Sequence, residues 1–457
     1  MSRKRSGSRG GPASQLQLEV VHPHAAGIDV GGSEHYVAID PRLDEHPVRC
    51  FGCFTTDLYR LADWLVENGV RTVAMQATGV YWVSLYEVLE SRSMEVFLVN
   101  ARHTKNLPGR KSDVQECQWL LQLHTYGLLR NSFQPPDEIR VMRTMWRHRA
   151  KLVAEAGSCI QRIGKSMTEM NIQLSLTIRD LSGVSGMSII RAILGGQRDP
   201  KKLAELAEPE VKASKEKIAE SLRGHWREEL LFVMRQQLEL YEVYQSKISE
   251  CDEKLKLHLL GLPPREGAES APLGPRKKGK RARGNSPKFD LRQHLYRLTG
   301  VDWASVDGVD VMTAQTVIAE TGVDMSRWPT ERHFASWLDL CPTNDVSGGK
   351  VIRRGNKKAQ NRATAAFRQA ATTLIKSNSY LGAQYRRFRA SLEKPKAVKA
   401  MAHKLARLFY RLLKYGQSYV DKGTEFYEQR YRERQILSVR KRARQLGLQI
   451  LDPVPAS

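Results

Sequence analysis

Hydrophobic residues in the first part of the chain follow two different periods. Short runs that alternate apolar and polar positions, or that are apolar throughout and bounded by glycine, predict strands, whereas a period near 3.6 predicts helices. Leu58, Leu61 and Leu65, for example, share one face of a helix that ends before Gly69. The predicted strands are 25–30, 35–39, 48–54, 72–76 and 94–100, and the predicted helices are 57–68, 80–92 and 113–127.

The order of these elements is three strands followed by alternating helices and strands. This order favours an α/β domain of the ribonuclease-H-like type, with a mixed sheet covered by helices. In such sheets, function lies at the carboxyl ends of the strands. We expect this domain over residues 21–135, after a basic, disordered arm at 1–20 that lacks the apolar stretch of a secretion signal.

A long, charged, helical region follows Pro135-Pro136 and extends over residues 136–262. Apolar residues recur in it at spacings of three and four. Such a face packs either within the chain or as a coiled-coil seam between two copies, and we favour a seam that dimerises the protein. The residues of this face are Leu230, Met234, Leu238, Tyr241 and Tyr244.

Proline-rich and strongly basic sequence separates this region from the C-terminal half. Segment 263–289 cannot bury a core and is expected to be disordered in the free protein. It is either a plain linker or a nucleic-acid clamp, because dense like charge repels itself without a polyanion. Its candidate contacts are Lys277, Lys278 and Arg281. We expect a mainly helical domain over 290–395 and a basic helical tail over 396–457.

Charge and composition limit the partners. A formal net charge of +24 and a pI near 9.8 indicate an anionic polymer, although a merely basic, ribosome-like protein would share them. No apolar run approaches the roughly 20 residues that span a membrane. The six scattered cysteines fit a reducing bacterial cytoplasm, where association with the nucleoid is expected.

Three carboxylates occupy positions where such a fold keeps its function. Asp29 ends the first strand, and Asp113 and Glu116 begin the last helix at a spacing that puts both on one face. Carboxylate oxygens are the ligands that Mg²⁺ prefers, and paired ions assist phosphoryl transfer. The alternative is that Asp29 is a turn residue and Asp113 a residue of the helix N-terminus.

A serine in the basic half is a candidate nucleophile. Ser347 precedes Gly348-Gly349, and glycines let the backbone approach a phosphate closely. A serine hydroxyl needs a base or a metal to become reactive, and the motif alone is commoner as an ordinary surface turn. The cations that would neutralise a pentavalent phosphorus are Lys350, Arg353 and Arg354.

Residues 306–314 form a second candidate nucleic-acid contact. They resemble the turn of a helix-hairpin-helix, in which backbone N–H groups at a helix start hold a DNA phosphate. Asp310 stands where a second glycine is usual, so a simple helix–helix connection is an equal alternative.

Taken together, these motifs resemble the DEDD-type transposases of the insertion sequence 110 family, which are recombinases guided by a structured bridge RNA. The resemblance covers nearly the whole chain. It is carried by residues 27–30 (Gly-Ile-Asp-Val), 77–82 (Ala-Thr-Gly-Val-Tyr-Trp), 99–103, 109–120, Pro342, 347–350 (Ser-Gly-Gly-Lys) and 354–356 (Arg-Gly-Asn).

The resemblance implies a RuvC-like N-terminal domain whose acidic tetrad binds Mg²⁺, and a C-terminal domain whose Ser347 attacks DNA and forms a covalent phosphoserine link. It also implies a composite site between subunits, dimers that pair into a tetramer, and a guide RNA from the element that selects donor and target DNA by base pairing. Arg110 and Lys111, before the acidic helix, join the nucleic-acid-binding candidates. The tetrad positions in this chain are Asp29, Gln76, Asp113 and Glu116.

Two of these positions depart from the family tetrad. Gln76 replaces a Glu, so its amide oxygen can still bind a metal but adds no negative charge, and Glu116 replaces an Asp. We expect a site that binds one Mg²⁺, positions the scissile phosphate and polarises Ser347 rather than activating water. Glu87 or Glu90, on the following helix, are the candidates that replace the missing charge.

Two other functions stay open beside strand exchange. A RuvC-like junction nuclease would use the acidic site alone, and its metal-dependent cleavage would survive Ser347→Ala. A non-catalytic nucleic-acid-binding protein would bind tightly without breaking strands, and Gln76 is the best argument for it. We favour the transposase.

Overall fold

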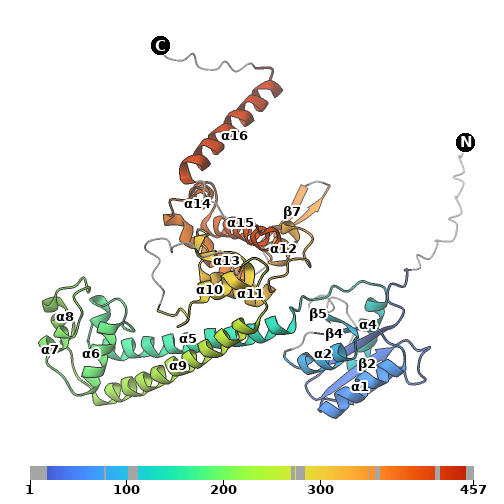
Figure 1. The fold of residues 1–457 in the computed structure, drawn as a ribbon, viewed down its shortest axis with the longest axis horizontal. Helices are drawn as coiled ribbons and strands as arrows, with labels where there is room; N and C mark the ends of the chain where they lie inside the picture. The colour runs from blue at the N-terminus through green and yellow to red at the C-terminus, as the bar shows by residue number, and fades with distance from the viewer. Residues whose placement is uncertain are drawn as a thin grey trace, which may run out of the picture. The chain divides into compact units, whose positions relative to one another are not determined.

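The computed structural model describes residues 18–76, 79–100, 112–268, 273, 284–348, 350–355, 361–416 and 423–448 (Figure 1). Its contacts divide the chain into two compact units, Met1–Gln134 and Pro135–Ser457. None of the helices in these described ranges is long and apolar enough to cross a membrane. The six cysteines are free thiols.

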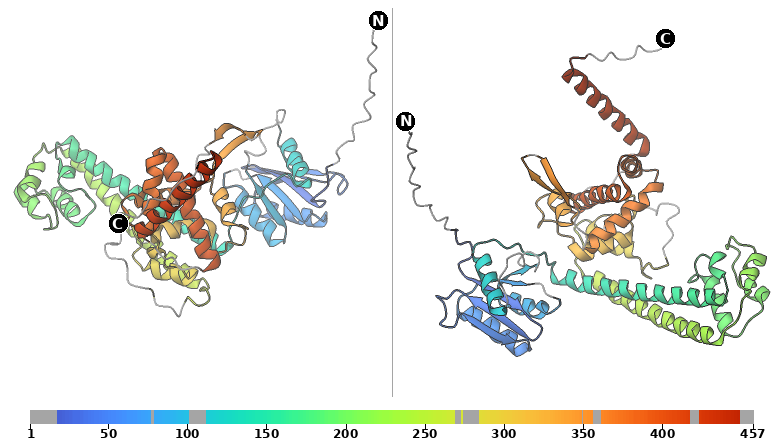
Figure 2. Two further views of the ribbon diagram at one scale, coloured as in Figure 1. Left: turned by 90° about the horizontal axis from the view of Figure 1, so that it is seen from above. Right: turned by 180° about the vertical axis from the view of Figure 1, so that it is seen from behind.

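The first unit contains a five-stranded mixed sheet in the order β3-β2-β1-β4-β5 (Figures 1 and 2). β2 pairs antiparallel with β1 and β3, whereas β4 pairs parallel with β1 and β5. All predicted strands and helices of this unit are present with small shifts at their ends, which is consistent with the ribonuclease-H-like order. The elements are β1 (Ala25–Val30), β2 (Glu34–Ile39), β3 (Val48–Gly52), α1 (Thr55–Glu67), β4 (Thr72–Gln76), α2 (Trp82–Ser91), β5 (Glu95–Val99) and α4 (Asp113–Thr125).

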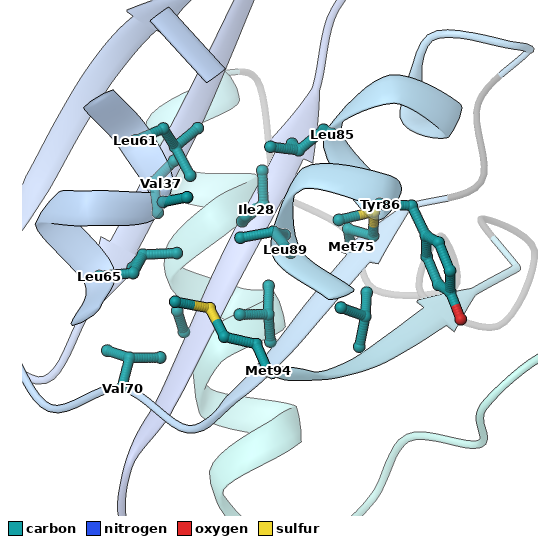
Figure 3. Packing of buried hydrophobic residues seen from close by; sticks show 14 of the residues in the cluster. Ile28, Val37, Leu61, Leu65, Val70, Met75, Leu85, Tyr86, Leu89 and Met94 are labelled. Atoms are coloured by element: carbon teal, nitrogen blue, oxygen red, sulfur yellow. The ribbon is translucent and has the colours of Figure 1, made fainter. Parts of the chain in front are cut away.

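Alternation along the strands gives the sheet two different faces. Ile28 belongs to the core that the sheet forms with α1 and α2, where Leu61 is fully buried (Figure 3). Gly27 lies on the opposite face, against α4, and a side chain there would collide with the backbone of Cys117 and Leu121. The close approach of α4 to β1 therefore requires glycine at this position.

Gly27→Ala is expected to lower the melting temperature, because the added methyl group must push α4 away from β1. Overpacking of this kind costs about 1–3 kcal/mol, which calorimetry would detect. The control is Gly157→Ala in the long helix α5 (Asp137–Glu169), where an added Cβ meets open space and should leave stability unchanged or raise it. An unchanged melting temperature for Gly27→Ala would show that α4 is not held tightly on β1.

The second unit begins with two long helices, α5 (Asp137–Glu169) and α9 (Glu228–Gly261), which lie side by side (Figure 1). They are antiparallel. Arg162, near the end of α5, donates a hydrogen bond to Gln237, near the start of α9, and His258, near the end of α9, contacts the carbonyl of Glu138 at the start of α5. A helical cap, residues 174–221, joins them. Its elements are η1 (Leu174–Leu176), α6 (Val184–Leu194), α7 (Pro200–Glu205) and α8 (Lys215–Ser221).

The apolar face of α9 that we favoured as a dimer seam is packed within the chain. Met234 and Leu238 are buried in a core shared by α5, α9 and the cap, and Leu230 and Tyr241 pack against it. The alternative of an intramolecular core therefore describes these four residues; Tyr244, the fifth of the predicted face, is not part of this core. Sequence spacing could not decide the matter, because a helix from the same chain and one from a second copy cover an apolar stripe equally well.

Buried polar contacts hold α5 to its neighbours in this unit. Arg149 pairs with Asp252 of α9, and both side chains are only 3% exposed. Arg147, which is partly exposed, donates to both carboxylate oxygens of Glu320 in α11 (Val311–Thr321), at 2.9 and 2.6 Å. Removing one partner of a buried pair leaves an uncompensated charge and typically costs about 3–5 kcal/mol, so the pair of Arg149 and Asp252 fixes α5 firmly on α9.

The rest of the second unit is mainly helical, as the sequence predicts for this part of the chain. Its core includes Trp303, whose ring stacks on Phe409 with the centroids 4.3 Å apart. A short hairpin, β6–β7, interrupts the helices. The elements are α10 (Leu291–Thr299), η2 (Trp303–Ser305), α11 (Val311–Thr321), α12 (Glu331–Trp337), β6 (Thr343–Ser347), β7 (Lys350–Gly355), α13 (Arg362–Thr373), η3 (Leu374–Lys376), α14 (Tyr380–Ser391), α15 (Lys394–Tyr415) and α16 (Gly423–Gln445).

Candidate functional site

The predicted metal ligands lie where the sheet meets α4. Asp29 stands at the end of β1 and, by strand alternation, on the face that α4 covers. Gln76 ends the neighbouring strand β4. Asp113 and Glu116 stand in the first turn of α4, which Ser112 caps. The fold thus brings the four tetrad positions, which are far apart in sequence, to one edge of the sheet.

Gln76 is in direct contact with the acidic helix. Its side chain is buried, and its Nε2 donates to Oε2 of Glu116 at 3.4 Å. The amide therefore turns a hydrogen-bond donor toward the carboxylate and links β4 to α4. A glutamate at position 76 would place two negative charges at this distance, so the amide stabilises the metal-free protein.

Asp29 and Asp113 both act on the thiol of Cys117. Burial is the main reason that the pKa of Cys117 is raised to about 12, and the negative charges of Asp29 and Asp113 add to it. Two predicted ligands from different elements are therefore within electrostatic reach of one buried side chain.

Glu34 is a carboxylate that sequence reasoning missed on this face. It accepts hydrogen bonds from the Tyr36 hydroxyl at 3.4 Å and from the Cys50 thiol at 3.6 Å. Hydrogen bonding to Cys50 and the charges of Glu34 and Asp113 raise the pKa of Tyr36. The hairpin register could have revealed this neighbourhood, because Tyr36 pairs with Asp29 and Glu34 lies two residues away on the same face.

The candidates for the missing negative charge need correction. Glu87 and Glu90 are exposed on α2, which packs on the other face of the sheet. They are therefore separated by the sheet from Asp29. Glu34 is the additional carboxylate on the α4 side of the sheet, because its charge and that of Asp113 both raise the pKa of Tyr36.

The donor set suits a hard cation, since carboxylate and amide oxygens are the ligands that Mg²⁺ prefers. Within the described part of the chain, however, no three His, Cys, Asp or Glu side chains lie close enough together to hold a metal ion. The residues that would hold Mg²⁺ are Asp29, Asp113 and Glu116, with the amide oxygen of Gln76. Their side chains would have to approach one another as the ion binds.

Ser347 lies at the tip of the β6–β7 hairpin. It is exposed and pairs in register with Lys350, which is also exposed. Gly348 has a φ of +56°, a conformation that favours glycine and makes the turn tight. The sequence predicted a glycine turn here, and the structure has one. The turn leaves the hydroxyl of Ser347 accessible to a large substrate.

The other predicted phosphate contacts are only partly defined by the structure. Arg353 and Arg354 lie on β7, opposite Asp345 and Asn344 in the main-chain register. The remaining candidates fall outside the described residues: Arg110, Lys111, Lys277, Lys278 and Arg281.

The turn that resembles a helix-hairpin-helix connects η2 to α11. Gly308 has a φ of +81°, and Asp310 caps α11 by accepting a hydrogen bond from the N–H of Thr313 at 2.8 Å. The aspartate thus occupies one of the backbone donors that would otherwise face a phosphate. These contacts favour the helix–helix connection over the phosphate contact.

His124 of α4 is a structural residue. It is fully buried, its Nε2 lies 2.9 Å from the Thr72 hydroxyl, and its ring stacks on His22. Burial, with a smaller contribution from the nearby His22, lowers the pKa of His124 to about 4. The ring is therefore neutral at physiological pH and holds α4 against the sheet.

This histidine is expected to make the protein less stable in acid. Since the pKa falls from about 6.5 in the unfolded chain to about 4 in the fold, only the unfolded chain gains a proton between these values. The neutral, buried ring of His124 therefore stabilises the fold fully above pH 6.5. As the pH falls to 4, the free energy of unfolding decreases by about 3 kcal/mol. Urea denaturation at pH 7 and 4.5 should show a smaller acid loss for His124→Leu than for the exposed control His46→Gln. An equal loss in both would contradict this assignment.

Comparison with known proteins assigns two parts of the chain. Residues 26–172 match the family model of the DEDD transposase of IS110 type, which is described as a transposase. Residues 303–386 match the model described as transposase IS116/IS110/IS902 family. No curated protein matches the chain. The first match contains Asp29, Gln76, Asp113 and Glu116, and the second contains Ser347.

Proposed function

Because the chain belongs to the IS110 family of transposases, we propose that it excises and inserts its element by RNA-guided strand exchange through a covalent phosphoserine intermediate. The observation that carries this proposal is the exposed hydroxyl of Ser347 at a tight turn beside Lys350. A nucleophile that attacks DNA must reach a phosphate within a bulky duplex, and a hairpin tip gives that access.

In the first chemical step, Oγ of Ser347 attacks the scissile phosphorus. The Oγ–P bond forms while one P–O bond to the adjoining sugar breaks, the serine proton passes to a base or to solvent, and the leaving sugar oxygen takes up a proton. In the second step, a sugar hydroxyl of the partner strand attacks the same phosphorus. The new P–O bond forms while the Oγ–P bond breaks, the hydroxyl gives up its proton, and the released serine Oγ takes one up. Bond energy is conserved in the ester, so no nucleotide cofactor is needed.

The acidic site would position the phosphate and support the serine rather than activate water. When bound, Mg²⁺ would polarise a phosphoryl oxygen and neutralise its charge. Asp29, Asp113 and Glu116 would hold the ion, and Gln76 would keep Glu116 in place through the hydrogen bond at 3.4 Å. With an amide in the tetrad, the site carries one negative charge fewer than the family tetrad, which is compatible with the binding of one Mg²⁺.

The partners of this reaction are donor and target DNA and a structured guide RNA from the element, which would select both sites by base pairing. The acidic site lies in the first unit and Ser347 in the second. We propose that they meet between subunits, in dimers that pair into a tetramer on nucleic acid. The net charge of +24 supports binding of several polyanionic strands.

The test is a covalent-trapping assay with the full chain, Mg²⁺, the noncoding RNA of the element and an end-labelled DNA junction. After denaturation, label should migrate with the protein, and mass spectrometry of the digested adduct should find the nucleotide on the peptide that contains Ser347. Cleaved DNA without an adduct would favour the junction nuclease. Binding without cleavage, with an RNA shown to support transposition in cells, would favour the non-catalytic protein.

Gln76→Glu tests the assignment of the metal ligands without an activity assay. In the absence of Mg²⁺ the new carboxylate faces Glu116, so the melting temperature should fall by about 5 °C, and Mg²⁺ should restore most of it. The products should still arise through Ser347. A melting temperature that Mg²⁺ does not change would remove Gln76 from the metal site, and a change from strand exchange to simple nicking would overturn the supporting role of the acidic site.

A further inference from the structure

Helix α15 (Lys394–Tyr415) carries a one-sided set of positive charges. Its sequence contains no Asp or Glu, and one face is buried in the core of the unit through residues such as Met401, Leu405 and Phe409. The cations fall on the opposite face at successive spacings of three to five residues. This α15 stripe consists of Lys396, Lys399, Lys404, Arg407, Arg411 and Lys414.

Like charges at these spacings repel one another along a helix, at a cost of a few tenths of a kcal/mol for each pair. Glu331 of α12 is the main counter-charge and accepts hydrogen bonds from Arg407 at 2.8 Å and Arg411 at 2.9 Å. Burial opposes ionisation of Glu331, but the two arginines outweigh it and the pKa of Glu331 is lowered. Glu331 thus holds both guanidinium groups in fixed positions.

Around Lys404, the single carboxylate of Glu331 does not balance the neighbouring positive charges. Partial burial lowers the pKa of the Lys404 ammonium group, and the charges of Arg407 and Arg411 lower it further, against a smaller opposite effect of Glu331. Arg434 of α16 adds to the same crowding. A crowded set of cations on a rigid helix is stabilised when a polyanion binds to it.

Helix α15 packs against α12, which ends at Trp337, a short connection before β6, so the stripe lies near the foot of the hairpin that carries Ser347. Cys341 stands two residues before β6, and although burial raises the pKa of its thiol, the charges of Lys399 and Arg407 lower it. These two cations are therefore within electrostatic reach of the foot of the hairpin. The family match ends at residue 386, so α15 lies beyond the matched segment.

We propose that the α15 stripe binds the phosphate backbone of a nucleic acid strand and leads it to the β6–β7 hairpin. The distance from Lys396 to Lys414 along the helix is about 27 Å, enough for several phosphates. The contacts are to backbone rather than to bases, so the stripe carries no sequence preference. The inference goes beyond strand exchange and does not require Ser347 to be the nucleophile.

The test compares two triple variants of the full chain that lose equal charge. In the stripe variant, Lys396, Lys399 and Lys404 become Gln, which leaves the hydrogen bonds of Glu331 with Arg407 and Arg411 in place. In the control, the exposed Lys201, Lys202 and Lys217 of the helical cap become Gln. Fluorescence anisotropy gives the affinity for a labelled DNA duplex and, separately, for a structured RNA hairpin, each between 0.05 and 0.3 M salt.

We expect the stripe variant to bind at least ten-fold more weakly at 0.1 M salt, with a salt slope smaller by about 2–3, and the control to match the wild type. Loss with DNA alone, RNA alone or both would identify the strand. Equal effects in both variants would show only general attraction and overturn the proposal, as would unchanged binding. Circular dichroism checks that each variant is folded. If the triple variant does not fold, the double variant Lys396→Gln with Lys399→Gln, near the N-terminus of α15, is tested in its place.

Discussion

Ser347→Ala is expected to abolish the covalent protein–DNA adduct and to lower strand exchange by at least about 10³-fold. A methyl group cannot form an ester with phosphorus, and removal of a nucleophile is among the largest losses that one substitution produces. Binding of DNA and RNA should remain, since Ser347 is exposed at a hairpin tip and supports no core. Trapping on denaturing gels, with a binding measurement on the same samples, separates the two properties.

The control for this prediction is Ser391→Ala. Ser391 is an exposed serine at the end of α14, and its hydroxyl donates to the backbone carbonyls of Arg387 and Phe388 in its own helix. It should form the adduct at the level of the wild type. Metal-dependent cleavage that persists in Ser347→Ala would identify the acidic site as a nuclease, whereas a persistent adduct would mean that another side chain is the nucleophile.

The fold of the first unit could be predicted because each of its elements has a local cause. The strands alternate, as Gly27 and Ile28 do between the two faces of the sheet, and α4 begins at a serine cap. The same alternation brought Asp29 and Gln76 to one edge. The alternation of residues along a strand depends on that strand alone, so it can be predicted without knowing which strands pair with it.

The contacts that sequence could not supply are those between elements distant in the chain. The location of Glu34 depends on hairpin register, and the ion pair of Arg149 with Asp252 joins residues far apart in sequence. The face of α9 shows the same limit, because spacing defines an apolar stripe but not the surface that covers it. Which charges balance each other, as Glu331 balances Arg407, is likewise a result of tertiary packing.

The acidic site and Ser347 differ in accessibility and in charge. A hydroxyl at the tip of a hairpin has access to DNA, and its partner in the strand register is Lys350, a cation rather than a general base. The acidic edge of the sheet has charge but, with Gln76, less of it than the family tetrad. A division of labour in which one site supplies the nucleophile and the other orients the phosphate accounts for both features.

Asp113→Asn is therefore expected to lower adduct formation about 10²–10³-fold without changing the product, because it removes one charge from the group that orients the phosphate. Asp113 is exposed in the first turn of α4, so the fold should be retained. The control is Asp63→Asn on α1, which removes a carboxylate that is also exposed and that pairs with Arg92. The yield of adduct should fall only in the first variant and should recover in part as Mg²⁺ is raised. Equal yields in both variants would mean that Ser347 acts without the acidic site, and the division of labour would have to be abandoned.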